Sequence, residues 1–306
     1  MEEKKIVIVG RGALGIMLGD FFVRRFGTET LRFVANPERL QRYEQEPVFC
    51  NGQRCDFRYS DGHNFQADFL IFAVKTTGLQ NAIEEAAPCV GPGTTILSVL
   101  NGVESEGTIG ATLGMEKVIG CVAQGMDPVM EENQVIYQMP GTILLGISPE
   151  EPEKQPRLEK AAELFAKAGM PYFIDEDIQH SMWGKLMVNV GVNQACMVYE
   201  TNYGGVQQPG EARETMITAM NETRKIAACQ GILITQKDLK EYLALIDSIT
   251  PEGMPSMRQD GLAGRKTEVD SFSGVILRLA ERYGMSVPVN RRLYDKIHQM
   301  EAFYEK

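Results

Sequence analysis

The sequence predicts an α/β fold in which a Rossmann-type domain with a parallel sheet is followed by an all-helical domain. Two observations predict the first domain. An apolar run at residues 5–10 leads directly into a glycine-rich loop, and further apolar runs alternate with helical patterns up to residue 176. A third observation predicts the second domain, because only helix-period patterns follow residue 176. We therefore expect a dinucleotide-binding domain over residues 1–176 and a helical, substrate-binding and catalytic domain over residues 177–306.

Short apolar runs of this kind are typical of strands that are buried on both faces of a parallel sheet. They occupy residues 5–10, 31–34, 68–74, 94–99 and 171–175, and helices are expected over residues 13–26, 76–87 and 152–168. Residues 48–50 and 54–58 flank Asn51-Gly52, a dipeptide typical of a hairpin turn, so they predict a β-hairpin. Strand-like runs also occur within residues 118–147. In the second half, glycine or proline residues predict breaks between helices at 203–205, 209–210, 251–253 and 287–288.

The composition excludes several classes of function. The formal net charge is −10 over 306 residues, so bulk attraction to nucleic acid or to an anionic membrane is not expected. No apolar run reaches membrane-spanning length and the N-terminus lacks a signal-peptide pattern, so we expect a cytoplasmic protein. The six cysteines include no Cys-x-x-Cys pair and there are only three histidines, so we expect reduced thiols and no metal site. A disulfide between Cys50 and Cys55 across the predicted hairpin is the alternative.

The glycine-rich loop predicts dinucleotide binding. It has the G-x-G-x-x-G pattern directly after a predicted strand and at the start of a predicted helix. The first glycine permits the tight turn, the second lets the backbone approach a pyrophosphate, and the third lets helix and strand pack closely. The amides at the helix start then face the phosphates. The cofactor-binding candidates here are Gly10, Arg11, Gly12, Ala13, Leu14 and Gly15. A glycine-rich turn without a cofactor is the alternative.

The end of the second predicted strand favours NADP(H) over NAD(H). An NAD site usually has an acidic residue there, about 20 residues past the last glycine, that binds the ribose 2′-hydroxyl. No acid ends this strand, and Glu38 falls in the following helical turn. Asn36 and Arg39 are therefore candidates for binding a 2′-phosphate, with Arg11 nearby; Arg39 as a solvated helix residue is the alternative.

Lys185, Asn189 and Asn193 are spaced four residues apart. On an α-helix this spacing places one cation and two carboxamides along one face, with apolar residues at most positions between. A solvated helix face does not require this order, whereas a site for a small, oxygen-rich substrate does.

Four further polar residues are candidates for the same chemistry. Lys75 and Asn101 each follow a predicted strand, at the sheet edge where open α/β sheets bind ligands. In the helical half, Ser256 and Glu268 stand near helix starts. A plain turn for Asn101, a helix cap for Ser256 and an N-terminal helix charge for Glu268 are the alternatives.

Together these motifs resemble the ketopantoate reductase family over nearly the whole chain. The resemblance rests on the glycine loop and on Ala73-Val74-Lys75, Leu100-Asn101-Gly102-Val103, Lys185-x-x-x-Asn189-x-x-x-Asn193, Ser256-Met257-x-Gln259-Asp260 and Arg265-x-Thr267-Glu268-x-Asp270. It implies a helical domain like that of 6-phosphogluconate dehydrogenase relatives, and NADPH-dependent reduction of ketopantoate to pantoate on the route to pantothenate and coenzyme A. It also implies that the binding partner is a small-molecule 2-keto acid, the substrate. We also consider that the protein forms a homodimer.

The resemblance assigns roles to the polar residues. It implies that Lys185 is the general acid, that Asn189, Asn193 and Ser256 contact the substrate, and that Lys75, Asn101 and Glu268 line the cofactor and active site. An ammonium suits the chemistry, because hydride addition to a 2-keto carbon builds negative charge on the carbonyl oxygen. Glu268 would orient Lys185.

The chain departs from many relatives at three places. Gln194 stands where proline is common, Arg11 where a small residue is common, and Thr201-Asn202-Tyr203 where Asn-Gly is common, so Asn202 is the substitute candidate for a substrate contact. These departures leave open a reductase of another branched 2-keto acid. A non-catalytic NADP(H)-sensing regulator is the alternative from another class.

Overall fold

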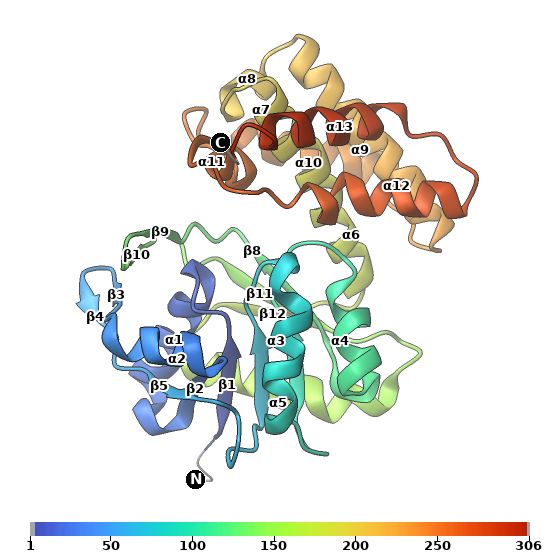
Figure 1. Cartoon of the computed structure of the whole chain (residues 1–306). Helices are drawn as coiled ribbons and strands as arrows, with labels where there is room; N and C mark the ends of the chain where they lie inside the picture. Colours follow the sequence, from blue (N-terminus) through green and yellow to red (C-terminus); the bar gives the residue numbers. More distant parts are fainter. Residues whose placement is uncertain (1–3, 305–306) are drawn as a thin grey trace. The chain divides into compact units, whose positions relative to one another are not determined.

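The computed structural model describes residues 4–304 of the chain, which form two compact units, one ending at Ile178 and the other beginning at Gln179. The first unit holds all the strands of the described residues and the second is entirely helical (Figure 1). The predicted succession of a parallel-sheet domain and an all-α domain is therefore confirmed.

A five-stranded parallel sheet forms the centre of the first unit. Its strands lie in the order β5-β2-β1-β6-β7, with every neighbouring pair parallel. Their bounds are β1 (Ile6–Val9), β2 (Leu31–Val34), β5 (Arg58–Ser60), β6 (Phe69–Phe72) and β7 (Thr95–Ser98). All four residues of β1, β6 and β7 are buried, as expected for strands that are covered on both faces.

Helices cover both faces of this sheet (Figure 1). On one face α1 and α5 pack through Phe22 and Phe165, whose ring centroids are 5.8 Å apart. On the other face α3 and α4 bury Ile83 and Ile109 against the sheet. The helices of this unit are α1 (Ala13–Phe26), α2 (Pro37–Gln45), α3 (Leu79–Ala86), α4 (Ser105–Leu113) and α5 (Gln155–Ala168). Short 3-10 turns lie at Thr28–Thr30, Thr76–Gly78, Ala87–Cys89, Met115–Lys117 and Pro152–Lys154.

Two small sheets complete the first unit. One has the order β12-β11-β8 and the other the order β4-β3-β10-β9. Their strands are β3 (Phe49–Cys50), β4 (Gln53–Arg54), β8 (Gly120–Gln124), β9 (Val129–Glu131), β10 (Gln134–Ile136), β11 (Thr142–Gly146) and β12 (Tyr172–Ile174).

The predicted hairpin about Asn51-Gly52 is present, but its second strand is shorter than expected. Asn51 and Gly52 have φ values of 47° and 75°, as the tight hairpin turn requires, and β3 pairs antiparallel with β4. The strand predicted over residues 54–58 ends at Arg54, because the chain then leaves for the parallel sheet. There Arg58 pairs with Arg32 as the first residue of β5.

None of the six cysteines, which all lie within residues 4–304, forms a disulfide, as the sequence predicted, and the alternative of a Cys50–Cys55 bridge is not present. Cys55 instead places its sulfur 3.9 Å from Oδ1 of Asp20.

The second unit is built around the long helix α9, which contacts α7, α8, α12 and α13 and a short π-helical segment, η6. Its elements are α6 (Ile178–Val188), η6 (Asn189–Asn193), α7 (Gln194–Val198), α8 (Tyr203–Gln207), α9 (Glu211–Cys229), α10 (Gln236–Ser248), α11 (Ser256–Leu262), η7 (Val269–Ser271), α12 (Ser273–Arg282) and α13 (Pro288–Glu301). None of the helices in residues 4–304 combines the length and the apolar character needed to cross a membrane.

The break predicted at residues 203–205 is wrong, because Tyr203 begins α8. The Asn202 side chain caps this helix by accepting a hydrogen bond from the amide of Gly205 (3.3 Å), and the Gly204 amide donates to the carbonyl of Pro251 (2.8 Å). Capping and these loop contacts stabilise a short helix despite two adjacent glycines.

Candidate functional site

Each glycine of the loop has a distinct environment. Gly10 has φ of +112°, and a Cβ there would lie 2.3 Å from the carbonyl oxygen of Ala73. A Cβ on Gly15 would lie 1.9 Å from the carbonyl oxygen of Gly10, so that position must stay bare for α1 to pack against the loop. Gly12 is the N-cap of α1, where no side chain caps the helix, and a Cβ there would meet nothing within 4 Å. The loop thus combines uncapped helix amides with open space at Gly12, which fits the pyrophosphate of a dinucleotide.

Arg11, in the middle of the loop, turns toward α2 and the neighbouring strand. Its guanidinium carbon lies 4.3 Å from the ring centroid of Tyr43 and 5.6 Å from that of Tyr59, and Nη2 donates to the carbonyl of Glu46 (2.6 Å). Burial raises the pKa of Tyr59. Arg11 therefore supplies a cation beside the loop that is held by stacking on aromatic rings.

Asn36 and Arg39 lie at the carboxyl end of β2, where the sequence placed them, but both bind an acid from elsewhere in the chain. Asn36 caps α2 by accepting a hydrogen bond from the Arg39 amide (2.9 Å), and its Nδ2 donates to Oε1 of Glu85 (3.1 Å). The Arg39 guanidinium forms an ion pair with the same oxygen. Glu85, on α3, was not among the predicted residues. No local pattern indicates it, because the contact spans 46 residues.

Lys75 and Asn101 occupy equivalent positions on neighbouring strands. Phe72 of β6 pairs with Ser98 of β7 in the parallel register. Lys75 lies three residues after Phe72, and Asn101 lies three residues after Ser98. Since Phe72 also pairs with Val9, just before Gly10, both residues follow the strand edge that carries the glycine loop. Lys75 is exposed and Asn101 is half-buried.

Lys185, Asn189 and Asn193 do not lie on one continuous α-helix. Lys185 is half-buried in the last part of α6, whereas Asn189 and Asn193 begin and end η6. The two carboxamides still face each other, because Nδ2 of Asn193 donates to Oδ1 of Asn189 (3.1 Å). The predicted adjacency of the asparagines therefore holds, although the predicted regular helix is wrong at these five residues.

Packing against α9 and a side-chain hydrogen bond account for the wider turn. A Cβ on Gly191 would lie 2.5 Å from Cγ of Met220, so the segment approaches α9 closely at a bare position. The fully buried Gln194 donates through Nε2 to the carbonyl of Val190 (2.7 Å), a backbone acceptor inside the π-helical segment. Such π-helical turns occur frequently at functional sites.

Asn193 joins this segment to α11. Its Oδ1 accepts hydrogen bonds from the amide of Met257 (3.1 Å) and from the hydroxyl of Ser256 (3.3 Å). The N-cap of α11 is Pro255, so the alternative of a Ser256 cap is wrong. Asn189, Asn193 and Ser256 thus form one hydrogen-bonded chain of polar side chains in the helical unit.

Glu268 is held by the backbone around it. The amides of Ser271 and Phe272 donate to its carbonyl (2.9 and 3.2 Å). The preceding Thr267 donates through its amide and its hydroxyl to Oε1 of the buried Glu301 (2.7 and 2.6 Å). The Glu268 side chain itself is half-buried. The alternative for this residue, an N-terminal helix charge, agrees with its position as N-cap of η7.

Asn202 makes no contact with Asn189, Asn193 or Ser256 among its hydrogen bonds, which serve the local backbone instead. Its side-chain oxygen caps α8 and its carbonyl accepts from the sulfur of Cys196 (3.3 Å). The structure thus gives Asn202 a capping function.

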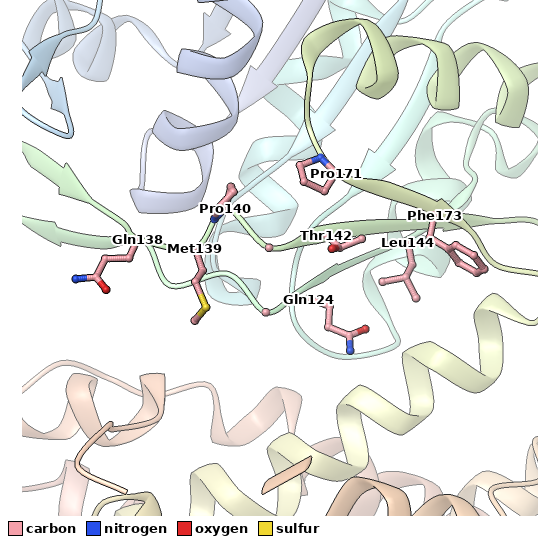
Figure 2. Close-up of a pocket in the computed structure, with 10 residues that line it drawn as sticks. Gln124, Gln138, Met139, Pro140, Thr142, Leu144, Pro171 and Phe173 are labelled. Carbon is pink, nitrogen blue, oxygen red and sulfur yellow. The ribbon is translucent and has the colours of Figure 1, made fainter. Parts of the chain in front are cut away.

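A hollow of about 630 Å³ lies on the β8, β11 and β12 sheet of the first unit (Figure 2). Its lining is uncharged and includes the carboxamide of Gln124, the hydroxyl of Thr142 and the apolar side chains of Met139, Leu144 and Phe173. Because no ionisable side chain lines it, it offers no cation to an anionic substrate. Among residues 4–304, no three His, Cys, Asp or Glu side chains are grouped so that they could hold a metal ion.

Comparisons with known proteins extend these observations. Two family models match the chain, "Ketopantoate reductase PanE/ApbA" over residues 6–150 and "Ketopantoate reductase PanE/ApbA C terminal" over residues 177–301. The 2-dehydropantoate 2-reductase of Vibrio cholerae is 24% identical over 98% of this chain and 99% of its own length. That of Aquifex aeolicus is 26% identical over 98% of this chain and 97% of its own.

Solved structures of similar proteins share the fold. A D-mandelate dehydrogenase bound to NADH and anilino(oxo)acetate has a TM-score of 0.86 at 23% identity, over 99% of this chain and 100% of that one. A PanE/ApbA family ketopantoate reductase from Ralstonia eutropha JMP134 has a TM-score of 0.83 at 24% identity, over 99% and 100% of the two chains. With the family models covering both units, this chain belongs to the ketopantoate reductase family of oxidoreductases.

Proposed function

We propose that this protein reduces a 2-keto acid with a reduced nicotinamide dinucleotide, and that the substrate is 2-dehydropantoate (ketopantoate), which becomes (R)-pantoate. The observation that carries the proposal is the hydrogen-bonded chain of Asn189, Asn193 and Ser256. This chain begins four residues after Lys185, in a protein that belongs to the ketopantoate reductase family. These groups offer one cation and several neutral hydrogen-bonding groups, which suits a small anion with hydroxyl and keto oxygens.

The glycine loop is the proposed site of the cofactor. Gly10 and Gly15 shape the turn, and the open position at Gly12 leaves the α1 amides available to a pyrophosphate. When bound, the reduced nicotinamide supplies a hydride. We place Lys75 and Asn101 beside it, because both follow the strand edge that carries the loop. The end of β2 predicted NADP(H), because Asn36 and Arg39 were expected to bind a 2′-phosphate. Both residues contact Glu85 instead, so the choice between NAD(H) and NADP(H) is open again.

Lys185 is the proposed general acid. As hydride reaches the keto carbon, negative charge develops on the carbonyl oxygen, and the Lys185 ammonium stabilises this charge and then gives up a proton from Nζ. We propose Glu268 as the carboxylate that orients this ammonium, since the bonds of Thr267 to Glu301 fix the backbone beside it.

The two asparagines are proposed to form part of the substrate site without adding charge, each in a different role. Asn193 is buried, and its amide and carbonyl groups are used to hold Asn189, Ser256 and the start of α11. Asn189 is half-buried, and within this network it only accepts a hydrogen bond. We therefore assign the direct substrate contact to Asn189 and a positioning role to Asn193. Ser256 is the second contact that we propose.

The test is oxidation of NADPH and of NADH, each followed at 340 nm after addition of ketopantoate to the purified protein. Turnover with ketopantoate that exceeds turnover with other 2-keto acids by about tenfold or more in kcat/KM would support the proposal. If NADPH or NADH binds to the protein but is not oxidised when any 2-keto acid is added, the alternative of a nicotinamide-sensing regulator would be supported.

A reductase of another bulky 2-keto acid is the second candidate. It is favoured by Gln194 and by the Asn202-Tyr203 loop, which differ from many relatives, and by the similarity in fold to the D-mandelate dehydrogenase. Phenylglyoxylate, the keto acid that corresponds to mandelate, is the comparison substrate that separates the two candidates. We keep a cytoplasmic homodimer as the proposed form of the protein, and light scattering tests the assembly.

A further inference from the structure

Glu85 lies where a bound dinucleotide would place its adenosine ribose. In this fold the ribose lies over the carboxyl end of the second strand of the sheet, beside the glycine loop. Val34 at the end of β2 pairs with Val9, the residue before Gly10, so Asn36 stands just past the level of the loop. The Glu85 backbone approaches the same strand end, because a Cβ on Gly62 would lie 3.0 Å from the carbonyl of Glu85 and 3.6 Å from Cγ1 of Val34.

One oxygen of Glu85 occupies the groups that would bind a phosphate. Oε1 accepts from Nδ2 of Asn36 (3.1 Å) and is paired with the Arg39 guanidinium. These are the donors at this strand end that the sequence offered to a 2′-phosphate. Arg11, the other cation nearby, is turned onto Tyr43 and the carbonyl of Glu46.

The other oxygen of Glu85 is buried and has no hydrogen-bond partner among residues 4–304. The side chain is 14% exposed, against 31% for Arg39. A carboxylate oxygen in this position requires a donor, and a ribose 2′-hydroxyl is a donor of the right size. A 2′-phosphate is mostly doubly ionised at neutral pH, so it is a poor donor and would bring close to two negative charges beside the carboxylate.

From these contacts we propose that Glu85 is the specificity-determining residue of the cofactor site, and that it selects NADH over NADPH by accepting a hydrogen bond from the ribose 2′-hydroxyl. An acid from α3 thus performs the task that an acid at the end of β2 performs in most NAD-binding sites. This inference rests on the proposed function only in requiring that the glycine loop bind a nicotinamide dinucleotide.

The experiment measures dissociation constants of NADH and NADPH by fluorescence titration, and of 5′-AMP and 2′-phospho-AMP by calorimetry, so that binding is read without catalysis. The wild-type protein is expected to bind NADH and 5′-AMP at least tenfold more tightly than their 2′-phosphorylated counterparts. Glu85→Gln keeps the shape of the side chain but removes its charge and releases Arg39, so the ratio should move at least tenfold toward the phosphorylated ligands. Arg39→Gln should move the same ratio of dissociation constants toward the ligands without a 2′-phosphate.

Glu84→Gln is the matched control, because Glu84 is an exposed neighbour on the same helix whose carboxylate accepts from Gln80 (3.2 Å). It should leave every ratio within twofold of the wild type. Tighter binding of NADPH by the wild type, or an unchanged ratio in Glu85→Gln, overturns the proposal for Glu85 while the dinucleotide site stands. Failure of all four ligands to bind overturns the dinucleotide site itself, and the proposed function with it.

Discussion

The side-chain carbonyl of Asn193 accepts a hydrogen bond from the backbone amide of Met257, with N and O 3.1 Å apart and the two residues 64 positions apart in the chain. The bond joins η6 to the first turn of α11 and brings Ser256 to the same carbonyl. Through its own amide, Asn193 also holds Asn189. One buried carboxamide therefore sets the relative positions of two proposed substrate contacts.

Asn193→Ala should destabilise the protein more than Asn189→Ala does. Removing the Asn193 carboxamide leaves the buried Met257 amide without its acceptor, which costs about 1–3 kcal/mol in the free energy of unfolding. Asn189 is half-buried and makes only one bond in this network, so its loss should cost less than about 1 kcal/mol. Urea unfolding followed by circular dichroism measures both values. Equal losses in the two variants would show that the tie to α11 contributes nothing to stability.

The three loop glycines should separate into two classes when each is replaced by alanine. Gly10→Ala and Gly15→Ala place a methyl group within 2.3 Å and 1.9 Å of a backbone oxygen, so each should lower stability by about 2 kcal/mol or more. Gly12→Ala meets no atom within 4 Å, so its stability should stay within about 0.5 kcal/mol of wild type. Its dinucleotide affinity should fall at least tenfold, because the methyl group fills the approach to the pyrophosphate.

Gly107→Ala provides the control for these variants. Gly107 is an exposed residue inside α4 with nothing within 4 Å of its added methyl group, so alanine should stabilise the protein by about 0.5–1 kcal/mol and leave dinucleotide binding unchanged. Thermal unfolding and a fluorescence titration with NADH and NADPH give both readouts. A Gly12→Ala protein that binds as tightly as wild type would contradict the assignment of the open space to the cofactor.

Local sequence patterns were sufficient for the elements around the loop. The helix predicted over residues 13–26 is α1 (Ala13–Phe26), and the strand predicted over residues 31–34 is β2 (Leu31–Val34). Both are marked by local signals, since Gly12 and Gly27 flank the helix and three of the four residues of the strand are apolar. The glycine pattern also predicted backbone contacts, because Gly10 and Gly15 each lie too close to a backbone oxygen for a side chain.

Long-range packing decided the features that the sequence did not predict. The turn at Asn189 and Asn193 widens where Gly191 meets Met220 of α9, a contact that no helical period reveals. The contact of Asn36 with Glu85 of α3 was likewise not predicted, and NADP(H) binding, which rested on the residues near β2 alone, stays a prediction. The helix α8 was missed because two glycines outweighed the capping asparagine before them.

Only one of the six cysteines should react quickly with Ellman's reagent at pH 8. Cys229 is exposed and the other five are buried. Burial raises the pKa of the Cys89 thiol to about 11 and that of Cys196 to about 12, so both remain protonated at pH 8. A fast phase equal to one thiol per chain, lost in Cys229→Ser, is the expected result, and all six should react in denaturant.

The Cys89 thiol should also make stability decrease at alkaline pH. Its pKa is raised from an ordinary value of 9.0 to about 11 in the folded protein, so the folded state holds the proton more tightly than the unfolded state does. The contribution is complete below pH 9 and is lost as the pH rises from about 9 to about 11. Comparing Cys89→Ala with wild type between pH 8 and pH 11 isolates this dependence, and parallel stability curves would contradict it.

Lys185→Ala should reduce turnover without weakening cofactor binding. If its ammonium protonates the keto oxygen, kcat should fall about 10²- to 10⁴-fold, the usual worth of one well-placed acid. Lys185 is not one of the residues that we propose to bind the dinucleotide, so the dissociation constants of NADH and NADPH should stay within twofold of wild type. Lys237→Ala, which removes a lysine whose side chain is 84% exposed on α10, should change neither quantity. If kcat in Lys185→Ala stayed within threefold of wild type, the proton would have to come from another group, and Glu268→Gln would then distinguish a carboxylic acid from solvent as its source.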